Sequence, residues 1–279
     1  MRELPEVESI RRGFEKEAAS KKIKTAEIVG PMSFFRGHSS KKSLVDKLEG
    51  AKINSVARRG LTLIATLNND HFMVIELGKQ GLMVKATPRE KVSEDTFLIL
   101  SYTQGGQTRF ADSSGKAVVS VLPEDAIAKH FPDLETIGLD PVEQPISWTA
   151  FGHLLTDKRS RLKQVLLDQT IVAGLGDVYV DEILFEAGLR PDRAPKSLTI
   201  QEIRRLYRSV VETLHDALKY RGTSLEGDDY VDFYGKPGDY GEHLKVFGLD
   251  KVACRRCREP IIRKRVSNTY AYLCEDCQI

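Results

Sequence analysis

The sequence predicts an α+β protein of several domains, with a β-rich N-terminal part, a helical middle part and a small cysteine module at the C-terminus. Three observations lead to this fold class. Short apolar runs separated by polar turns occupy residues 50–125, apolar residues recur at helical spacing beyond residue 145, and every cysteine follows residue 253. The 279 residues and their 41% hydrophobic content suffice for two domains of ordinary size.

The N-terminal part reads as a series of short strands rich in Val, Ile, Leu, Thr and Phe. The expected strands are 55–67, 72–77, 97–102 and 118–122, and polar turns such as Gly105-Gly106 separate them. Regularly spaced short strands are typical of a sandwich or a barrel. Residues 8–19 carry apolar positions at helical spacing, so we expect a helix to precede the strands.

The middle part begins after a linker expected at 141–145 and carries three predicted helices, 160–168, 177–187 and 199–219. The last of them starts with Thr199 as a plausible N-cap and Glu202 three residues later. Residues 222–241 are rich in Gly, Asp and Tyr and are expected to be irregular. The predicted domains are therefore 1–135, 136–248 and 249–279.

Charge and hydropathy place few limits on the partner but favour a cytoplasmic protein. The formal charge is +2, from 42 Lys and Arg against 40 Asp and Glu, so only local charge can indicate a nucleic-acid partner. No apolar run reaches the ~20 residues that cross a bilayer, and the N-terminus has no apolar signal core. We expect a cytoplasmic protein without membrane contact, nucleoid-associated if bacterial.

The four cysteines form two Cys-x-x-Cys pairs, Cys254 with Cys257 and Cys274 with Cys277. Two such pairs supply four thiolates to a tetrahedral Zn²⁺, and a closed shell of four protein ligands indicates one structural ion. The alternative is a pair of redox dithiols. A module this short buries too little apolar surface to fold alone, so the metal is expected to supply much of its folding free energy.

The cysteine module is also basic, with seven Lys or Arg against three acids from residue 251 onward. This bias favours contact with phosphates. A solvated basic ribbon that binds a protein partner is the alternative. Upstream, Gly174 and Gly176 lie between two predicted helices, where a tight turn can expose the backbone N–H groups at a helix start to a phosphate. The same pattern is equally typical of a structural turn.

Three segments in this order resemble the formamidopyrimidine-DNA glycosylase and endonuclease VIII family. Residues 167–191 resemble its helix–two-turn–helix element, residues 3–8 its N-terminal signature, and residues 235–248 the approach to its zinc finger. The resemblance implies an N-terminal β-sandwich with flanking helices, a helix–two-turn–helix domain and a C-terminal zinc β-ribbon. It also implies a monomer that binds duplex DNA, damaged or distorted, and flips a nucleotide out of the stack.

Carried over residue by residue, the resemblance implies DNA-binding roles in the helix–two-turn–helix element and in the finger. The candidates are Lys163, Gly174, Gly176, Asp177, Tyr179, Arg263, Lys264 and Thr269. Two of them depart from the family pattern. Asp177 replaces the usual asparagine at the helix start, and Thr269 replaces the usual arginine five residues before the third cysteine.

The catalytic pattern departs more strongly. In the family, an N-terminal proline exposed by loss of the initiator Met attacks C1′ of the damaged nucleotide, and here that position is Arg2. The acidic partner Glu3 is present and can move protons. If Met1 is retained, the terminal amine lies one residue further out. The family's lysine after Arg58-Arg59-Gly60 is replaced by Leu61 and Thr62, and Lys79 and Lys116 occupy the loops of its wedge residues.

Three functions remain open on this evidence. The first is a DNA-binding paralogue that recognises damage or structure with lost or altered catalysis. The second is an active DNA glycosylase and AP lyase that uses the primary amine of Met1 or Arg2 together with Glu3. The third is a zinc-ribbon adaptor that binds protein.

Overall fold

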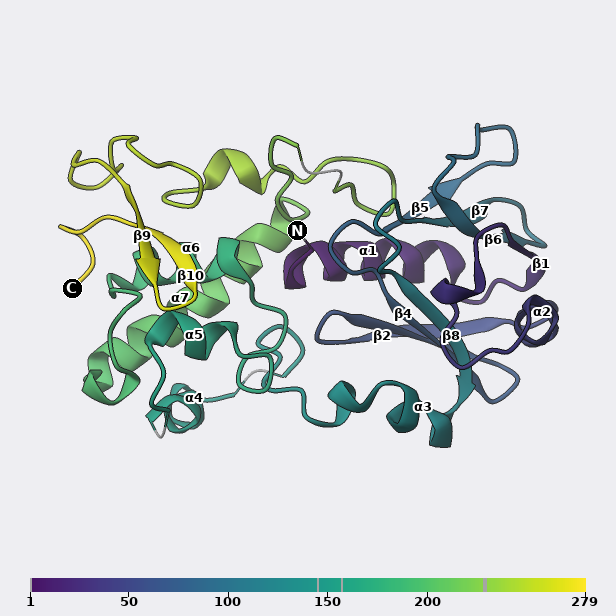
Figure 1. Cartoon of the computed structure of the whole chain (residues 1–279), viewed down its shortest axis with the longest axis horizontal. Coiled ribbons are helices and arrows are strands. Elements are labelled where there is room, and N and C mark those ends of the chain that lie inside the picture. The colour runs from purple at the N-terminus through teal and green to yellow at the C-terminus, as the bar shows by residue number, and fades with distance from the viewer. Residues whose placement is uncertain (1, 145, 157, 228–229) are drawn as a thin grey trace. The chain divides into compact units, whose positions relative to one another are not determined.

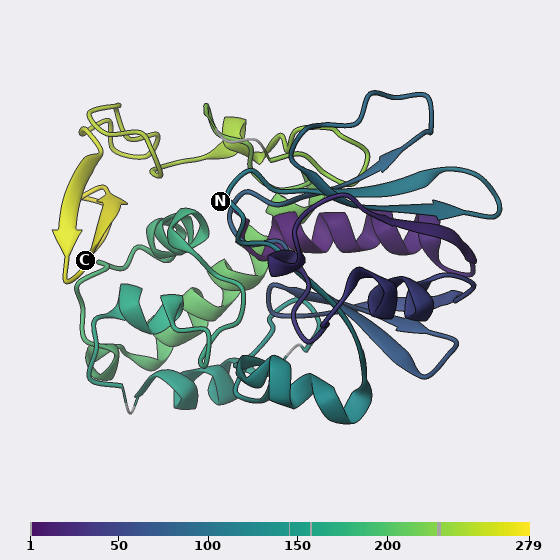
Figure 2. The same cartoon turned by 45° about the vertical axis from the view of Figure 1, so that its right-hand side comes forward.

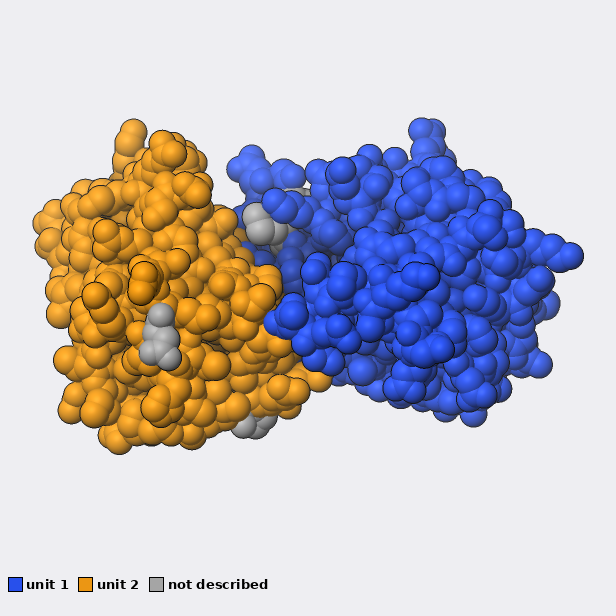
Figure 3. Space-filling view, turned by 60° about the horizontal axis from the view of Figure 1, so that its bottom comes forward, with its two compact units in different colours: residues 1–136, 220–239 blue, residues 137–219, 240–279 orange. Residues whose placement is uncertain are grey.

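The computed structural model describes residues 2–144, 146–156, 158–227 and 230–279, which form two compact units. Unit 1 comprises residues 1–136 and 220–239, and unit 2 comprises 137–219 and 240–279 (Figure 3). Pro145, which belongs to the predicted linker, lies outside the described residues. Within the described ranges, no helix combines the length and the apolar composition that crossing a bilayer requires.

Unit 1 is a sandwich of two antiparallel four-stranded sheets. One sheet has the order β1-β6-β7-β5 and the other β2-β3-β4-β8. The strands are β1 (Ile23–Ile28), β2 (Ile53–Arg59), β3 (Thr62–Leu67), β4 (His71–Glu76), β5 (Leu82–Ala86), β6 (Thr96–Tyr102), β7 (Gln107–Ala111) and β8 (Val118–Pro123). The expected sandwich is thus confirmed, but the predicted strand 55–67 is a hairpin that turns at Gly60, where φ is +59°.

Helices flank the sandwich and one of them fills its centre. Helix α1 (Leu4–Ala18) lies between the sheets, and Val7, Ile10 and Phe14 join side chains of both sheets in one core (Figures 1 and 2). It starts four residues earlier than predicted because Pro5 suits the first helical turn and Glu6 accepts a hydrogen bond from the Glu3 N–H at 2.8 Å. The other helices of unit 1 are η1 (Met32–Phe34), α2 (Lys41–Leu48), α3 (Glu124–His130) and η2 (Pro132–Glu135).

The segment 220–239 belongs to unit 1, which corrects the predicted boundary of the middle domain at 136–248. Its aromatic residues Tyr230 and Phe233 are buried in the core of the sandwich, where the Phe233 ring lies 5.7 Å from that of Phe14. The Phe233 carbonyl also accepts a hydrogen bond from the N–H of Lys85 on β5 at 2.8 Å. The Gly-rich composition of the segment predicted an irregular loop and gave no indication that Tyr230 and Phe233 pack in the core of unit 1.

Unit 2 contains the helices and the cysteine module. Its elements are α4 (Trp148–Thr156), α5 (Leu162–Leu167), α6 (Asp177–Ala187), η3 (Pro195–Ser197), α7 (Ile200–Lys219), η4 (Tyr240–His243), β9 (Ile262–Val266) and β10 (Thr269–Leu273). The predicted helix 177–187 is confirmed as α6. The predicted cap of α7 is also confirmed. The Thr199 N–H donates a hydrogen bond to the Glu202 carboxylate at 2.7 Å, and the Glu202 N–H donates to the Thr199 hydroxyl at 3.3 Å.

A buried ion cluster ties α1 to the second sheet, and its removal should destabilise unit 1. Burial alone would raise the pKa of Glu8, but the guanidinium groups of Arg11, Arg12 and Arg58 outweigh it and lower that pKa to about 2. We expect Glu8→Gln to cost about 3 kcal/mol of unfolding free energy at pH 7, because the fully buried Arg58 loses its carboxylate. Denaturant titration measures this loss.

The pH dependence of the same interaction has a definite sign. Because the folded pKa of Glu8 lies below its ordinary value of 4.5, its contribution is complete above pH 4.5 and disappears as the pH falls towards 2. The wild type should therefore lose stability over this range more steeply than Glu8→Gln. Glu15→Gln is the matched control, since the Glu15 side chain is 39% exposed and forms an ion pair with Arg11, so it should cost at most about 1 kcal/mol. Equal costs for the two variants would contradict the cluster's assigned role.

Candidate nucleic-acid interface and metal centre

The four predicted metal ligands come together at the base of the β9–β10 hairpin. The Sγ atoms of Cys254, Cys257, Cys274 and Cys277 all lie within 4.8 Å of one another, with 3.9 Å between Cys254 and Cys277 and 3.3 Å between Cys257 and Cys274. Four thiolates at about 2.3 Å from one tetrahedral ion would be about 3.8 Å apart. All four cysteines are free, so the geometry fits a metal centre and differs from a pair of disulfides.

The hairpin is attached to helices α5 and α6 along its free edge. In the two-stranded sheet, Tyr270 and Tyr272 of β10 direct their backbone groups away from β9, which leaves these groups in need of partners. The Lys163 ammonium donates to the Tyr270 carbonyl at 2.5 Å, and the Asp181 carboxylate accepts from the Tyr272 N–H at 2.8 Å. The buried side chains of Lys163 and Asp181 therefore satisfy backbone groups of β10 that a third strand of the sheet would otherwise bond.

Lys163 is consequently a structural cation, which differs from its predicted contact with phosphate. Its side chain is fully buried, and its ammonium also contacts Asp181 at 2.8 Å and Asp177 at 2.9 Å. With the Tyr270 carbonyl, these partners use all three N–H donors of the ammonium. Burial raises the pKa of Asp181 to about 7, although Lys163 and the Tyr272 N–H act in the opposite direction.

The two positions that depart from the family pattern in unit 2 contact each other. The Thr269 hydroxyl donates to Asp177 Oδ1 at 3.0 Å, and the same oxygen contacts Lys163. Asp177 is in the first turn of α6, where a negative charge is favourable for the helix dipole. The structure thus joins Asp177 and Thr269 in one network, and Asp177 remains 34% exposed.

The glycine turn before α6 forms the tight turn that the sequence predicts, while its contact with a phosphate stays a prediction. Gly174 has a φ of +79°, and its N–H is taken by the side chain of Gln169 at 2.7 Å. Gly176 is the N-cap of α6 and offers no side chain there. Tyr179 is fully buried and packs against the Tyr240 ring at 5.8 Å, so the structure places this predicted DNA contact in the interior of unit 2.

The structural roles of Glu182 and Asp181 were not predicted from the sequence. Glu182 is fully buried and accepts hydrogen bonds from the N–H groups of Lys245, Val246 and Phe247 at 2.9 to 3.1 Å, which fixes the approach to the cysteine module. Burial raises the pKa of Glu182, whereas the N–H donors lower it. A sequence signal was present, since Asp181 and Glu182 are adjacent acids in the middle of α6, flanked by Val180 and Ile183.

At the N-terminus, the structure places the side chain of Arg2 in the interior of unit 1. It is 4% exposed and donates to the carbonyls of Lys79, Gln80 and Gly81 at 3.0 to 3.4 Å, and its guanidinium lies 5.4 Å from the Tyr230 ring centroid. Glu3 is buried beside it as the N-cap of α1. Met1, the remaining predicted catalytic residue, lies outside the described residues.

The loops predicted to replace the family's wedge residues lie side by side in unit 1. A Cβ added at Gly78 would be 3.5 Å from the Cβ of Lys116, and both Lys79 and Lys116 are exposed. Asp112 fixes the second loop, because its carboxylate accepts from the N–H groups of Ser114, Lys116 and Ala117. Thr62 is buried in β3, so no cation replaces the family's lysine there.

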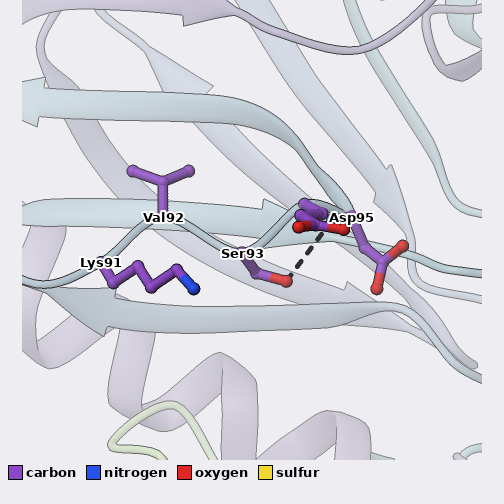
Figure 4. Close-up of a pocket in the computed structure, with 5 residues that line it drawn as sticks. Lys91, Val92, Ser93 and Asp95 are labelled. Atoms are coloured by element: carbon purple, nitrogen blue, oxygen red, sulfur yellow. Dashed lines mark hydrogen bonds between the residues drawn. The ribbon is translucent and has the colours of Figure 1, made fainter.

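The β9–β10 hairpin carries the basic residues predicted for DNA contact, Arg263 on its outer face and Lys264 on the opposite face. Arg263 and Arg265 are exposed, and Lys264 is half-buried with its ammonium 3.6 Å from Glu275. The Arg263 guanidinium lies 4.0 Å from the centroid of the Tyr270 ring. By contrast, a surface hollow of about 470 Å³ in unit 1 is lined by five exposed residues of one loop, 91–95, and brings together no group from another element (Figure 4).

Comparison with known proteins agrees with this architecture. Residues 1–117 match the model of the formamidopyrimidine-DNA glycosylase N-terminal domain, and residues 137–228 match that of the formamidopyrimidine-DNA glycosylase H2TH domain. The formamidopyrimidine-DNA glycosylases of Pelotomaculum thermopropionicum and Desulfitobacterium hafniense strain DCB-2 are each 32% identical to this chain. The alignments cover all of this chain and 99% and 100% of those relatives.

Solved structures give the same result. The Lactococcus lactis Fpg in complex with DNA containing an abasic site superposes with a TM-score of 0.87, and its complex with DNA containing Fapy-dG with 0.86. Each is 29% identical, and 99% of both chains is covered. The sandwich, the helix–two-turn–helix unit, the cysteine cluster and the full-length similarity together establish that this chain belongs to the formamidopyrimidine-DNA glycosylase family.

Proposed function

We propose that this protein binds duplex DNA at damaged or distorted nucleotides and lacks the N-terminal amine chemistry of its family. Family membership and the lesion-containing DNA in the solved relatives support the DNA-binding part. Arg263, exposed on the outer face of the hairpin, and Lys264, half-buried on its opposite face, supply charge for phosphate contact and are the proposed residues. From membership of the same family we also propose that the protein is a monomer and that it works in the cytoplasm, where its DNA is located.

The position of Arg2 carries the argument against the family's chemistry. A proline at this place would present its secondary amine to the sugar, whereas Arg2 anchors its own guanidinium to three carbonyls of the 79–81 loop. Residue 2 is thereby part of the scaffold of unit 1. A terminal amine on Met1 would lie one residue beyond the position that the family uses.

We also propose that the cysteine cluster holds one structural Zn²⁺. The distances between the thiol sulfurs and the all-cysteine donor set support this ion. When bound, the metal contributes folding free energy, and all four coordination positions are filled by protein, so the bound ion has no open position for catalysis.

A second function, an active glycosylase and AP lyase with a primary amine, is favoured by Glu3. Its carboxyl group is retained and buried at the start of α1, directly beside residue 2. A neutral primary amine on Met1 or Arg2 could attack C1′ of the damaged nucleotide and displace its base. Opening of the sugar ring, with Glu3 transferring a proton to the ring oxygen, would then leave a Schiff base between the amine and C1′. This candidate differs from the first in predicting a covalent intermediate.

Borohydride trapping on a duplex with an abasic site separates the two candidates. We expect a salt-sensitive gel shift without a covalent adduct. Arg2→Pro is the informative comparison, since it restores the family's residue at position 2, and an N-terminally blocked preparation identifies the amine in any adduct. A wild-type adduct that blocking abolishes would establish the lyase and overturn our proposal. If no shift occurred even at low salt, the zinc-ribbon adaptor would be the remaining function.

A further inference from the structure

The outer face of the β9–β10 hairpin combines exposed aromatic and guanidinium groups. Side chains that face each other across an antiparallel pair point to the same side of the sheet. The register pairs Tyr270 with Arg265 and Tyr272 with Arg263, so these four residues share one face. The opposite face carries Val266, Ala271 and Leu273, which are buried in unit 2. The aromatic and basic face is therefore the one directed to solvent.

Tyr270 is unusually open for a large aromatic side chain in a strand. It is 49% exposed, while the Arg263 guanidinium lies 4.0 Å from its ring centroid. The neighbouring Tyr272 ring packs edge-on against Phe247 at 5.1 Å and is only half-buried. Tyr270 and Arg263 thus form a stacked pair of planar groups at the surface, which we call the stacking pair.

Hydrogen bonds to the backbone of the hairpin fix the position of the stacking pair. The backbone of Tyr270 is fixed by the buried Lys163, that of Tyr272 by the buried Asp181, and the Arg263 N–H donates to Asp250 at 3.0 Å. A preorganised aromatic plane loses little conformational entropy when a flat ligand stacks on it. The attached edge of β10 therefore presents Tyr270 in a defined orientation.

We infer that the Tyr270–Arg263 stacking pair binds an unpaired nucleobase of DNA. Nucleobases are planar and stack on tyrosine rings and on guanidinium groups alike, whereas a paired base inside a duplex offers no free face. Arg265, directly across from Tyr270, adds a positive charge for the phosphate of the same nucleotide. The inference rests on the proposed DNA binding and specifies what is recognised: a nucleotide outside the helical stack.

The alternative is a cross-strand pair that only stabilises the hairpin. Fluorescence anisotropy with two labelled DNAs distinguishes these roles: a duplex with one bulged nucleotide and a fully paired duplex of equal length. We expect the wild type to prefer the bulged duplex and Tyr270→Leu to weaken that complex about tenfold, with the paired complex changed by less than about twofold. Tyr270→Phe keeps the ring and should retain the preference.

Equal losses on both DNAs, or no loss on either, would overturn the inference while leaving the proposed function intact. Failure of the wild type to bind either DNA would overturn both. Zinc content and melting temperature of each variant show whether the hairpin is intact.

If Tyr270→Leu does not fold, 2-aminopurine at the bulged position tests the wild type directly. Stacking on Tyr270 should quench its emission when the protein is added. Binding without any change in emission would contradict the inference.

Discussion

Chelation of the metal is expected to detach the cysteine module, residues 249–279, from unit 2 and to abolish DNA binding. The apolar cluster around the cysteines is very small: Cys254, Ile261 and Cys274 of the module pack there with Phe185 and Val246, which lie outside the module. Without an ion, four thiols with sulfurs 3.3 to 4.8 Å apart, two of them on buried cysteines, would have no strong partner. Structural zinc contributes about 10–16 kcal/mol of apparent binding free energy in isolated finger peptides, which far exceeds what this core supplies.

The measurement combines zinc release with spectroscopy. A chelator and a colorimetric zinc indicator give the stoichiometry, which we expect to be one ion per chain, and NMR spectra report the loss of dispersed signals from β9 and β10. Anisotropy with labelled duplex should then show at least about a hundredfold weaker binding, because the basic face of the hairpin is no longer presented. Signals from the sandwich of unit 1 should persist, since none of its residues belongs to the module.

Cys274→Ser is the genetic equivalent of chelation, because a serine hydroxyl is a poor ligand for zinc beside three thiolates. Glu259→Ser is the matched control in the same module, since its side chain is exposed and is not among the four clustered ligands. Retention of zinc and DNA affinity in Cys274→Ser would contradict a structural four-cysteine site.

The sequence predicts best where the determining interactions are local. Spacing alone identified the four cysteines that cluster in space, and the periodicity of residues 177–187 and 199–219 identified α6 and α7. Thr199 and Glu202 illustrate why, since a capping box involves residues three positions apart. Strands β1 and β5 were not predicted, and their pairing partners β6 and β7 are not their neighbours in sequence. Strand β7 was also missed, although it pairs with the preceding β6, because its first three residues are polar.

Positions whose roles depend on distant partners were harder to predict. Lys163 resembles a surface cation in the sequence, and only the fold shows that Asp181 and the Tyr270 carbonyl enclose it. Arg2 resembles a lost nucleophile, yet its guanidinium binds a loop 77 to 79 positions away. Tyr230 and Phe233 follow the same rule, because their packing partners lie in α1 and the sheets. The place of a residue in a sequence motif therefore does not by itself determine the role of its side chain.

The second large effect, on stability, is expected where Lys163 and Asp181 attach the β9–β10 hairpin to α5 and α6. We expect Lys163→Met to reduce the unfolding free energy of unit 2 by about 3–5 kcal/mol, because Asp181 is left buried without a cation and the Tyr270 carbonyl without a donor. Urea titrations followed by circular dichroism measure this loss. Asp177→Asn is the matched control: Asp177 is 34% exposed and an asparagine can still accept from Thr269, so its cost should stay near or below about 1 kcal/mol.

A double-mutant cycle separates the ion pair from simple loss of packing. Lys163→Met combined with Asp181→Leu removes both charges, so the double variant should be more stable than the sum of the two single losses predicts. Strict additivity would mean that the two side chains do not interact energetically, which would contradict the structure's 2.8 Å contact.

The loss caused by Lys163→Met should also grow with pH. With Lys163 present, burial already holds the folded pKa of Asp181 at about 7, above its ordinary value of 3.8, and removal of the ammonium raises it further. A group whose folded pKa is raised destabilises the fold as the pH rises, by about 1.4 kcal/mol per pH unit between the unfolded and folded values. Wild type and variant should thus differ more at pH 8.5 than at pH 6.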